Sequence, residues 1–169
     1  VLPDTAAPED VLAALRRQLR KRSTSGASGT PPATVPARHG RVLAIVSCKG
    51  GSGATFIAAN LASLLAAGGK RRVALIDMNL QFGDAALFVT SERPGSHVAD
   101  VSRNIGRLDR DLLQSAMMQA APGLWVLAAP DDPAHAAEVL PEHVLAILKL
   151  AREMFDFVVI DTGRSLSAV

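Results

Sequence analysis

The sequence of 169 residues has little of three things: cysteine, aromatic side chains and long hydrophobic runs. Its single cysteine, Cys48, excludes an internal disulfide and the cysteine-rich zinc sites that need several thiolates. Aromatic residues make up only 4% of the chain, too few for the stacking surfaces that bind single-stranded nucleic acid. No apolar run approaches the roughly 20 residues of a membrane span, and the first residues lack the features of a signal peptide. These absences favour a cytoplasmic protein without a membrane span or a specific nucleic-acid partner.

The charge of the chain is unevenly placed. Residues 1–40 hold six basic and three acidic residues, whereas residues 41–169 hold twelve basic and thirteen acidic ones. The net charge of +2 therefore comes from the first 40 residues, and the remainder has no excess of basic side chains. This balance argues against general DNA binding by the main domain. Hydrophobic residues at 49% and charged residues at 20% suit one folded domain rather than a disordered chain.

The first 40 residues are predicted to lie outside the main domain. Residues 8–22 have an acidic start, a basic end and an apolar stripe at helical spacing, which predict a short amphipathic helix. Because so short a helix is marginal alone, the stripe implies a partner surface. Residues 1–22 resemble the last loop and final helix of a response-regulator receiver domain, and we expect the rest of such a domain before Val1. A helix that docks on the main domain is the alternative. Residues 23–40 are rich in Ser, Thr, Gly and Pro and are predicted to be a flexible linker.

From residue 41 onward, apolar strands alternate with helices. Strands apolar on both faces, separated by helices, predict an α/β fold with a mostly parallel sheet covered on both sides, that is, three layers. The predicted strands, all expected to be buried, are 42–47, 73–76, 124–128 and 157–160. The predicted helices are 55–67, 96–103, 109–120 and 141–155.

The most specific motif is the glycine-rich segment 48–55, which lies between a predicted strand and a predicted helix. Its glycines allow the backbone to turn tightly and to point successive N–H groups inward, and the helix adds its positive N-terminal end. The Thr55 hydroxyl is suited to bind Mg²⁺. A strand-to-helix turn without a ligand is the alternative. The pattern predicts a phosphate-binding loop formed by Lys49, Gly50, Gly51, Ser52, Gly53, Ala54, Thr55 and Phe56.

Two aspartates, Asp77 and Asp161, each follow an apolar predicted strand. The carboxyl ends of parallel strands form the edge at which open α/β sheets bind ligands. Asp161 has the Walker B arrangement, in which an aspartate holds Mg²⁺ through water. Thr162 and Gly163 would then begin a loop that senses the γ-phosphate. Each aspartate could instead have a structural role, Asp77 as a cap after its strand, and Asp84 is a weaker candidate for the same site.

The glycine-rich loop departs from the usual P-loop pattern G-x-x-x-x-G-K-[ST], because Cys48 replaces the first glycine and Ala54 replaces the lysine. The early Lys49 resembles the deviant pattern K-G-G-x-G-K-[ST] of the MinD/ParA family of ATPases. This resemblance implies that Lys49 reaches across a homodimer interface to the partner's nucleotide and that Asp77 lies near Mg²⁺ and the attacking water. Loss of the second lysine predicts weaker nucleotide binding and slower hydrolysis. Asn79 stands where many relatives have Asp; it can orient water but cannot act as a general base.

The resemblance extends over residues 41–169 and is similar in detail to the CpaE/TadZ subfamily, MinD-like proteins of Flp/Tad type IVb pilus assembly. The segments that carry it are DMNLQFGDAALFV, RPGSHVADV, GLWVLAAPDDPAHAAEVLPEHV and FDFVVIDTGRSL. The motif K-G-G-x-G-A-T and a receiver-like domain ahead of it are typical of this subfamily. The resemblance implies a cytoplasmic homodimer that binds ATP and Mg²⁺, hydrolyses ATP slowly, marks a cell pole and recruits components of the Tad pilus secretion machinery.

Two other functions stay open from the sequence. A non-catalytic scaffold that binds nucleotide and acts by localisation is motivated by Ala54 and Asn79, and another positioning ATPase of the MinD/ParA type is possible as well. A Rossmann-type dinucleotide enzyme is disfavoured, because the chain lacks the G-x-G-x-x-G fingerprint. Because a P-loop fold needs at least one more strand–helix unit, we expect residues 41–169 to be the N-terminal part of an ATPase domain that continues beyond Val169.

Overall fold

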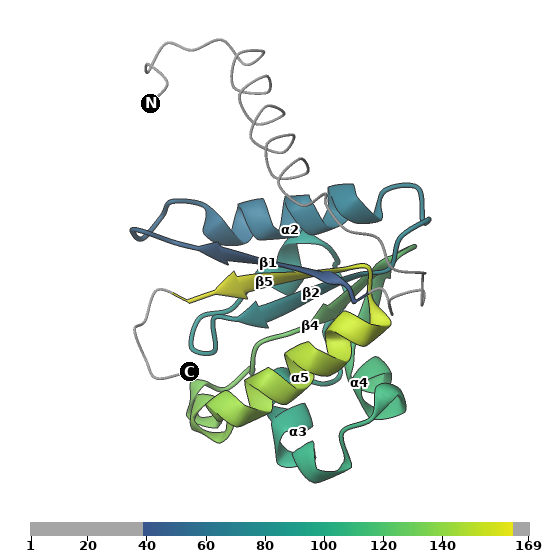
Figure 1. The fold of residues 1–169 in the computed structure, drawn as a ribbon. Helices are drawn as coiled ribbons and strands as arrows, with labels where there is room; N and C mark the ends of the chain where they lie inside the picture. The colour runs from purple at the N-terminus through teal and green to yellow at the C-terminus, as the bar shows by residue number, and fades with distance from the viewer. Residues whose placement is uncertain (1–38, 164–169) are drawn as a thin grey trace, which may run out of the picture. The chain divides into compact units, whose positions relative to one another are not determined.

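The computed structural model of the chain describes residues 39–163 (Figure 1). The predicted helix at 8–22 and all but the last two residues of the predicted linker lie outside the described residues. Gly40, the last residue of that predicted linker, is buried. Its N–H group donates a hydrogen bond to the carbonyl oxygen of Arg152 (2.6 Å), so it packs against the end of a helix.

Five strands form one mostly parallel sheet, in the order β1-β5-β2-β4-β3. All neighbouring pairs are parallel except β3 and β4, which are antiparallel. The sheet confirms the predicted α/β class, and its parallel core confirms the four predicted strands to within two residues at each end. The strands are β1 Arg41–Val46, β2 Val73–Met78, β3 Met118–Ala121, β4 Leu124–Leu127 and β5 Phe157–Thr162.

Helices cover both faces of the sheet, which gives the three predicted layers. Helix α2 lies along one face, and α3, α4 and α5 lie on the other (Figure 1). Three short 3-10 turns, η1 Ala85–Phe88, η2 Ile105–Arg107 and η3 Pro133–Glu138, lie between these elements. The helices are α2 Ala54–Ala66, α3 Val98–Arg103, α4 Arg110–Ala116 and α5 Pro141–Met154. Among the described residues, none of the helices has the length and apolar character needed to cross a membrane.

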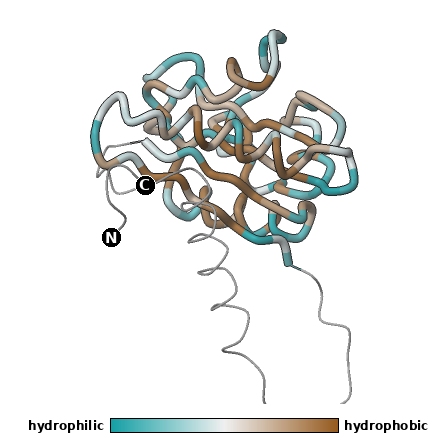
Figure 2. The backbone as a smooth tube through the Cα atoms, turned by 90° about the horizontal axis from the view of Figure 1, so that it is seen from above, coloured by the Kyte–Doolittle hydropathy of each residue, from teal (hydrophilic) through white to brown (hydrophobic). Residues whose placement is uncertain are grey.

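The core is split into two halves by the sheet. Along β2, Val73 and Leu75 pack toward α2, whereas Ala74 and Ile76 pack toward the opposite helices, as the alternation of a strand requires. The tube in Figure 2 is brown, and so hydrophobic, along the strands of the interior and teal at many of the turns around them. Helix α2 meets the sheet through small side chains, which let the helix lie close to it. These are Ala58, Ala59, Ala62 and Ala66.

Strand β1 is less buried than its apolar sequence predicts. Among the described strands it pairs only with β5. Leu43 and Ile45 pack against the core on the α2 side, but Val42 and Val46 are 39% and 67% exposed. The prediction of a buried strand therefore agrees with the α2 side of β1, whereas Val42 and Val46 are exposed among the described residues.

The helix predicted at 109–120 is shorter in the structure. Helix α4 ends at Ala116, and residues 118–121 form strand β3 instead. A tight turn joins β3 to β4, and Gly123 adopts a positive φ of 85° within it. A Cβ atom there would lie 2.6 Å from the carbonyl oxygen of Arg71, so the turn needs glycine both for its conformation and for space.

Candidate functional site

The loop between β1 and α2 has the backbone that the glycine motif predicts. Gly51 and Gly53 adopt positive φ angles of 72° and 78°, a region that side chains with a Cβ atom rarely enter. The loop is held by its own hydrogen bonds: the Ser47 hydroxyl donates to the Lys49 carbonyl oxygen (2.6 Å) and lies 2.8 Å from the Ser52 hydroxyl. The amide of Ser52 also donates to the Lys49 carbonyl oxygen (3.3 Å). The turn is therefore a defined structure.

The N-terminal end of α2 has free hydrogen-bond donors. Its N-cap residue is Gly53, no side chain caps it, and its first turn contains no acidic residue. The first N–H groups of a helix have no partner within the helix, and the helix dipole makes this end positive. An uncapped start of a 13-residue helix behind a glycine loop is suited to bind an anion such as phosphate.

A pocket of about 550 Å³ opens in front of this helix end. It brings together the predicted loop residues from Gly50 to Phe56 with Thr162 and Gly163 at the end of β5. Four of the residues that line it were not predicted from the sequence, namely Ser47, Gln81, Phe82 and Phe88. Phe82 is 78% exposed and follows β2 closely in sequence, but its residue type carries no phosphate-binding signal that could have identified it.

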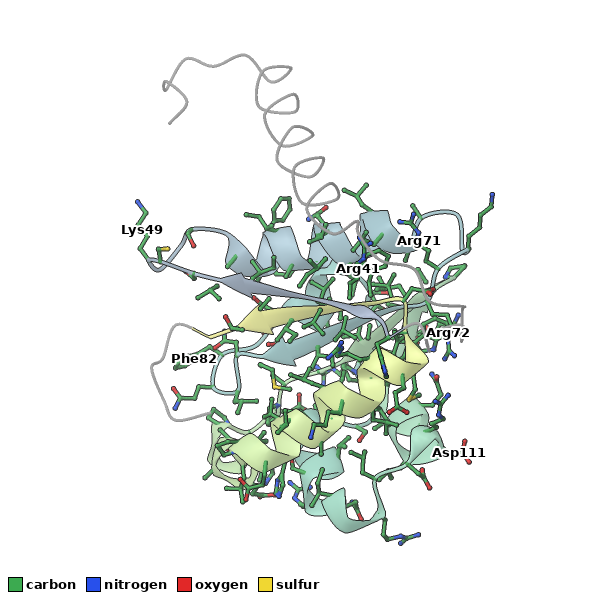
Figure 3. The ribbon with its side chains drawn as sticks, viewed as in Figure 1. Arg41, Lys49, Arg71, Arg72, Phe82 and Asp111 are labelled. Atoms are coloured by element: carbon green, nitrogen blue, oxygen red, sulfur yellow. The ribbon has the colours of Figure 1, made fainter. Side chains whose placement is uncertain are left out.

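Lys49 is the one predicted loop residue that does not line the pocket. Its side chain is exposed and extends outward from the tip of the loop (Figure 3). Ala54, which stands where the usual motif has lysine, is half-buried in the pocket wall. The described lining of this pocket therefore includes backbone of the glycine loop but no lysine side chain.

Asp77 and Asp161 lie side by side at the carboxyl end of the sheet. They are paired in the register of β2 and β5, and each is only 1% exposed. The Asp77 carboxylate accepts hydrogen bonds from the amides of Asn79 (3.0 Å) and Ala85 (2.9 Å). Burial is the main reason that the pKa of Asp77 is raised to about 7. The two amide hydrogen bonds oppose this shift, and the negative charges of Asp161 and Asp84 add to it.

Asp161 is also 1% exposed, but no backbone amide among the described residues donates a hydrogen bond to its carboxylate. Neither of its carboxylate oxygens has a hydrogen-bond partner among the described residues. Burial raises its pKa, and the nearby Thr55 hydroxyl opposes the shift in part. A buried carboxylate without partners is stable only when it is protonated or faces a cation. Magnesium takes one or two protein oxygens and fills its other positions with water and phosphate oxygens, so Asp161 and Thr55 fit such an ion.

Two further polar residues predicted near the site, Asp84 and Asn79, differ in whether they line the pocket. Asp84 is exposed and does not line the pocket. Asn79 does line it, and its side-chain amide donates to the carbonyl oxygen of Phe82 (2.9 Å). A Cβ atom on Gly163 would lie 3.0 Å from Asn79 Oδ1, so the loop after β2 and the end of β5 are closely packed here.

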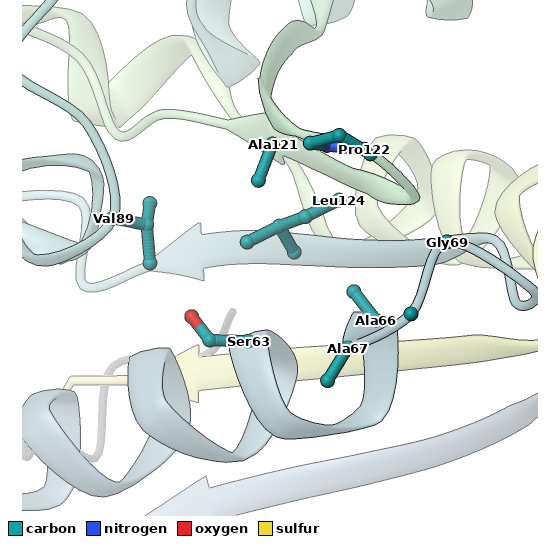
Figure 4. Close-up of a pocket in the computed structure, with 9 residues that line it drawn as sticks. Ser63, Ala66, Ala67, Gly69, Val89, Ala121, Pro122 and Leu124 are labelled. Carbon is teal, nitrogen blue, oxygen red and sulfur yellow. The ribbon is translucent and has the colours of Figure 1, made fainter.

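A second pocket, of about 390 Å³, lies near the other end of α2 (Figure 4). No charged residue lines it, and neither the glycine loop nor the two buried aspartates reach it. Its walls therefore suit an apolar group rather than a phosphate. They are formed by Ser63, Ala66, Ala67, Gly68, Gly69, Val89, Ala121, Pro122 and Leu124.

Comparison with known proteins finds a matching family model and similar solved structures. Residues 40–169 match the family model described as an AAA domain. A ParA family ATPase from Chlorobium tepidum is 31% identical with a TM-score of 0.72, over 76% of this chain and 54% of that one. The cell division ATPase MinD of Pyrococcus furiosus is 29% identical with a TM-score of 0.64, over 76% and 52%.

The septum site-determining protein MinD of Pyrococcus horikoshii, solved as a complex with Mg-ADP, is 26% identical with a TM-score of 0.63, over 75% of this chain and 50% of that one. The chain thus spans about half the length of these solved structures. Among curated proteins, none matches the chain at a significant level.

Proposed function

This chain belongs to the AAA-domain family that its residues 40–169 match, with the fold of MinD/ParA-type ATPases, and on that premise we propose that it is a nucleotide-controlled positioning switch. It binds ATP with Mg²⁺ and hydrolyses the nucleotide slowly. The observation that carries the proposal is the uncapped start of α2, which faces a glycine-lined pocket. The buried carboxylate of Asp161, which has no backbone amide partner among the described residues, directly precedes Thr162 in the wall of that pocket.

Each part of the pocket has a task in this proposal. The amides from Gly50 to Thr55 bind the phosphates, and Thr55 and Asp161 hold the magnesium ion, Asp161 through water. Bound there, Mg²⁺ would neutralise negative charge on the phosphate oxygens. Thr162 and Gly163, which line the same pocket, contact the γ-phosphate end and change position with the nucleotide state.

Lys49 acts in the site of a second copy. The support is that its exposed side chain extends away from its own pocket, which has Ala54 where a lysine would otherwise stand. Only a partner that packs on this end of the molecule could receive the Lys49 ammonium. The protein is then a nucleotide-dependent homodimer, and with no lysine of its own in each cradle it binds ATP weakly and turns it over slowly.

The cellular role is the CpaE/TadZ-like one: assembly of a Flp/Tad type IVb pilus by a cytoplasmic protein at a cell pole that recruits the Tad secretion machinery. The support for this finer function is the sequence resemblance alone, above all the loop motif K-G-G-x-G-A-T. Polar localisation of a fluorescent fusion, and its loss together with pilus assembly when Lys49 is replaced, would support it. A uniformly distributed fusion in cells that make normal pili would contradict it.

The biochemical test is phosphate release by the full chain with ATP and Mg²⁺. Lys49→Ala is expected to lower the rate at least about tenfold, because a lost contact to a transition-state charge costs 1.4 kcal/mol or more. Lys70→Ala is the matched control, since Lys70 is an exposed lysine at the other end of α2 and is expected to have no effect. Equal rates of phosphate release by the wild type and Lys49→Ala would contradict the proposal.

A non-catalytic scaffold is the second candidate, and Ala54 in the pocket wall is the observation that favours it. Equilibrium ATP binding without phosphate release would support it. Ala54→Lys then decides whether the rest of the site is intact, because it restores a cation beside the phosphates. A rise in turnover indicates a catalytic site silenced by that one residue, and no rise counts against such a silenced site.

A further inference from the structure

We infer that Asp77 is a positioning residue, whose carboxylate holds the loop 79–85 in place as one wall of the nucleotide pocket, and that Asp161 alone supplies the carboxylate for magnesium. The sequence predicted that both aspartates lie at the magnesium ion, so this division of roles differs from that prediction. It rests on the proposed function for the identity of the ligands, but the positioning role itself concerns the protein without nucleotide.

The first observation is the way in which the loop binds Asp77. The amide of Asn79 donates to one carboxylate oxygen (3.0 Å) and the amide of Ala85 donates to the other (2.9 Å). These donors stand near the two ends of the loop, so one buried side chain fixes both.

The second observation is the cover over Asp77. A Cβ atom on Gly83 would lie 2.6 Å from both carboxylate oxygens and 2.4 Å from the Cβ atom of Ala129. The backbone of the loop therefore lies directly against the carboxylate, and this side has no room for a methyl group. A magnesium ion with its water ligands is larger than a methyl group, so it cannot reach Asp77 from the side of Gly83 while the loop is in this position.

The third observation is the contrast with Asp161, its neighbour in the sheet register. The two side chains are both 1% exposed, yet Asp77 has two amide partners, whereas Asp161 has no amide partner within residues 39–163. Asp161 also lies near the Thr55 hydroxyl at the start of α2, whereas the bonds of Asp77 go to the loop. Among residues 39–163, the carboxylate whose oxygens have no backbone amide partner is therefore that of Asp161.

The loop that Asp77 holds contributes residues to the wall of the pocket. Asn79, Gln81 and Phe82 all line the pocket, and all three lie between the two amides that Asp77 fixes or at one of them. The bond from the Asn79 side chain to the Phe82 carbonyl oxygen (2.9 Å) braces this wall further. Asp77 thus shapes the pocket without touching its ligand.

The first test is hydrogen exchange of the full chain without nucleotide. In Asp77→Asn, the side-chain NH₂ group would face an amide N–H, so we expect the amides of Asn79 and Ala85 to exchange about tenfold faster or more. Gly83→Ala keeps the carboxylate but displaces its cover, and the same loop should exchange faster. Asp161→Asn is the matched control, for which loop exchange should not change. Unchanged exchange in both Asp77→Asn and Gly83→Ala overturns the inference.

The second test separates magnesium from nucleotide. With ATP present, Asp161→Asn should raise the Mg²⁺ concentration for half-maximal nucleotide binding about tenfold or more. Asp77→Asn and Gly83→Ala should weaken ATP binding but leave that Mg²⁺ concentration within about twofold of the wild type. An equal shift in Asp77→Asn and Asp161→Asn contradicts the division of roles. If the wild type binds no ATP, the proposed function fails, while the exchange comparison still decides whether Asp77 holds the loop.

Discussion

At the scale of single residues, Asp77 shows how burial changes the pKa of a carboxyl group. Its carboxyl group is 1% exposed, and burial raises its pKa from 3.8 to about 7 even though two amides donate to it. The sequence could predict an aspartate at the ligand edge, because an acidic residue after an apolar strand marks that edge. It could not predict that Gly83 and Ala85, six and eight residues later, return to cover and bind the group.

The raised pKa predicts a pH dependence of stability. Between about pH 4 and 7 the folded chain keeps a proton at Asp77 that the unfolded chain loses, so the free energy of unfolding falls as the pH rises through this window. The loss from Asp77 is roughly 2–4 kcal/mol. Asp77→Asn has no such proton, so its stability should change less over the same range; the change that remains would come from Asp161, whose pKa burial also raises.

Urea unfolding of the nucleotide-free chain at about pH 4.5 and about pH 7.5 measures this difference. Asp84→Asn is the matched control, because Asp84 is exposed and its removal should keep most of the pH dependence. The same loss of stability in Asp77→Asn and in the wild type would show that Asp77 does not retain its proton in the folded chain.

At the scale of elements, strands and helices were predicted where one pattern was unambiguous. β2 and β5 are almost continuously apolar, and α5 has a proline at its first turn and a clear helical period, so their limits agree with the prediction within two residues. β3 was missed because Met118–Ala121 consists of residues that favour helices in isolation, and pairing with β4 overrides that preference.

The turn between β3 and β4 makes a prediction at this scale. Gly123→Ala should lower the free energy of unfolding by roughly 1–3 kcal/mol, because it strains a positive φ and brings a Cβ atom against the Arg71 carbonyl oxygen. Gly106→Ala is the matched control, since nothing lies within 4 Å of its added methyl group and its φ is not positive. Urea unfolding compares the two, and equal stability would mean that the turn tolerates a side chain.

At the scale of the whole molecule, the residues of the candidate nucleotide site lie at one end of the sheet. The glycine loop, Phe82 and the exposed Lys49 lie at the carboxyl edge of the sheet, whereas Arg41, Arg71 and Arg72 lie at the opposite end (Figure 3). The loop and Asp161 were predicted from local sequence patterns. The wall formed by the loop 79–85 was not, because it depends on contacts between β2, β5 and the segment after β2 that no local pattern contains.

The central claim is that the start of α2, together with Thr55 and Asp161, binds ATP through magnesium. Isothermal titration calorimetry of the full chain with ATP, in excess Mg²⁺ and in excess chelator, tests it most directly. We expect binding with Mg²⁺, and Thr55→Val, which removes the hydroxyl at nearly constant shape, should weaken that binding about tenfold without changing the affinity in chelator. No heat from the wild type with ATP and Mg²⁺, or equal affinity of Thr55→Val and the wild type in Mg²⁺, would contradict the account.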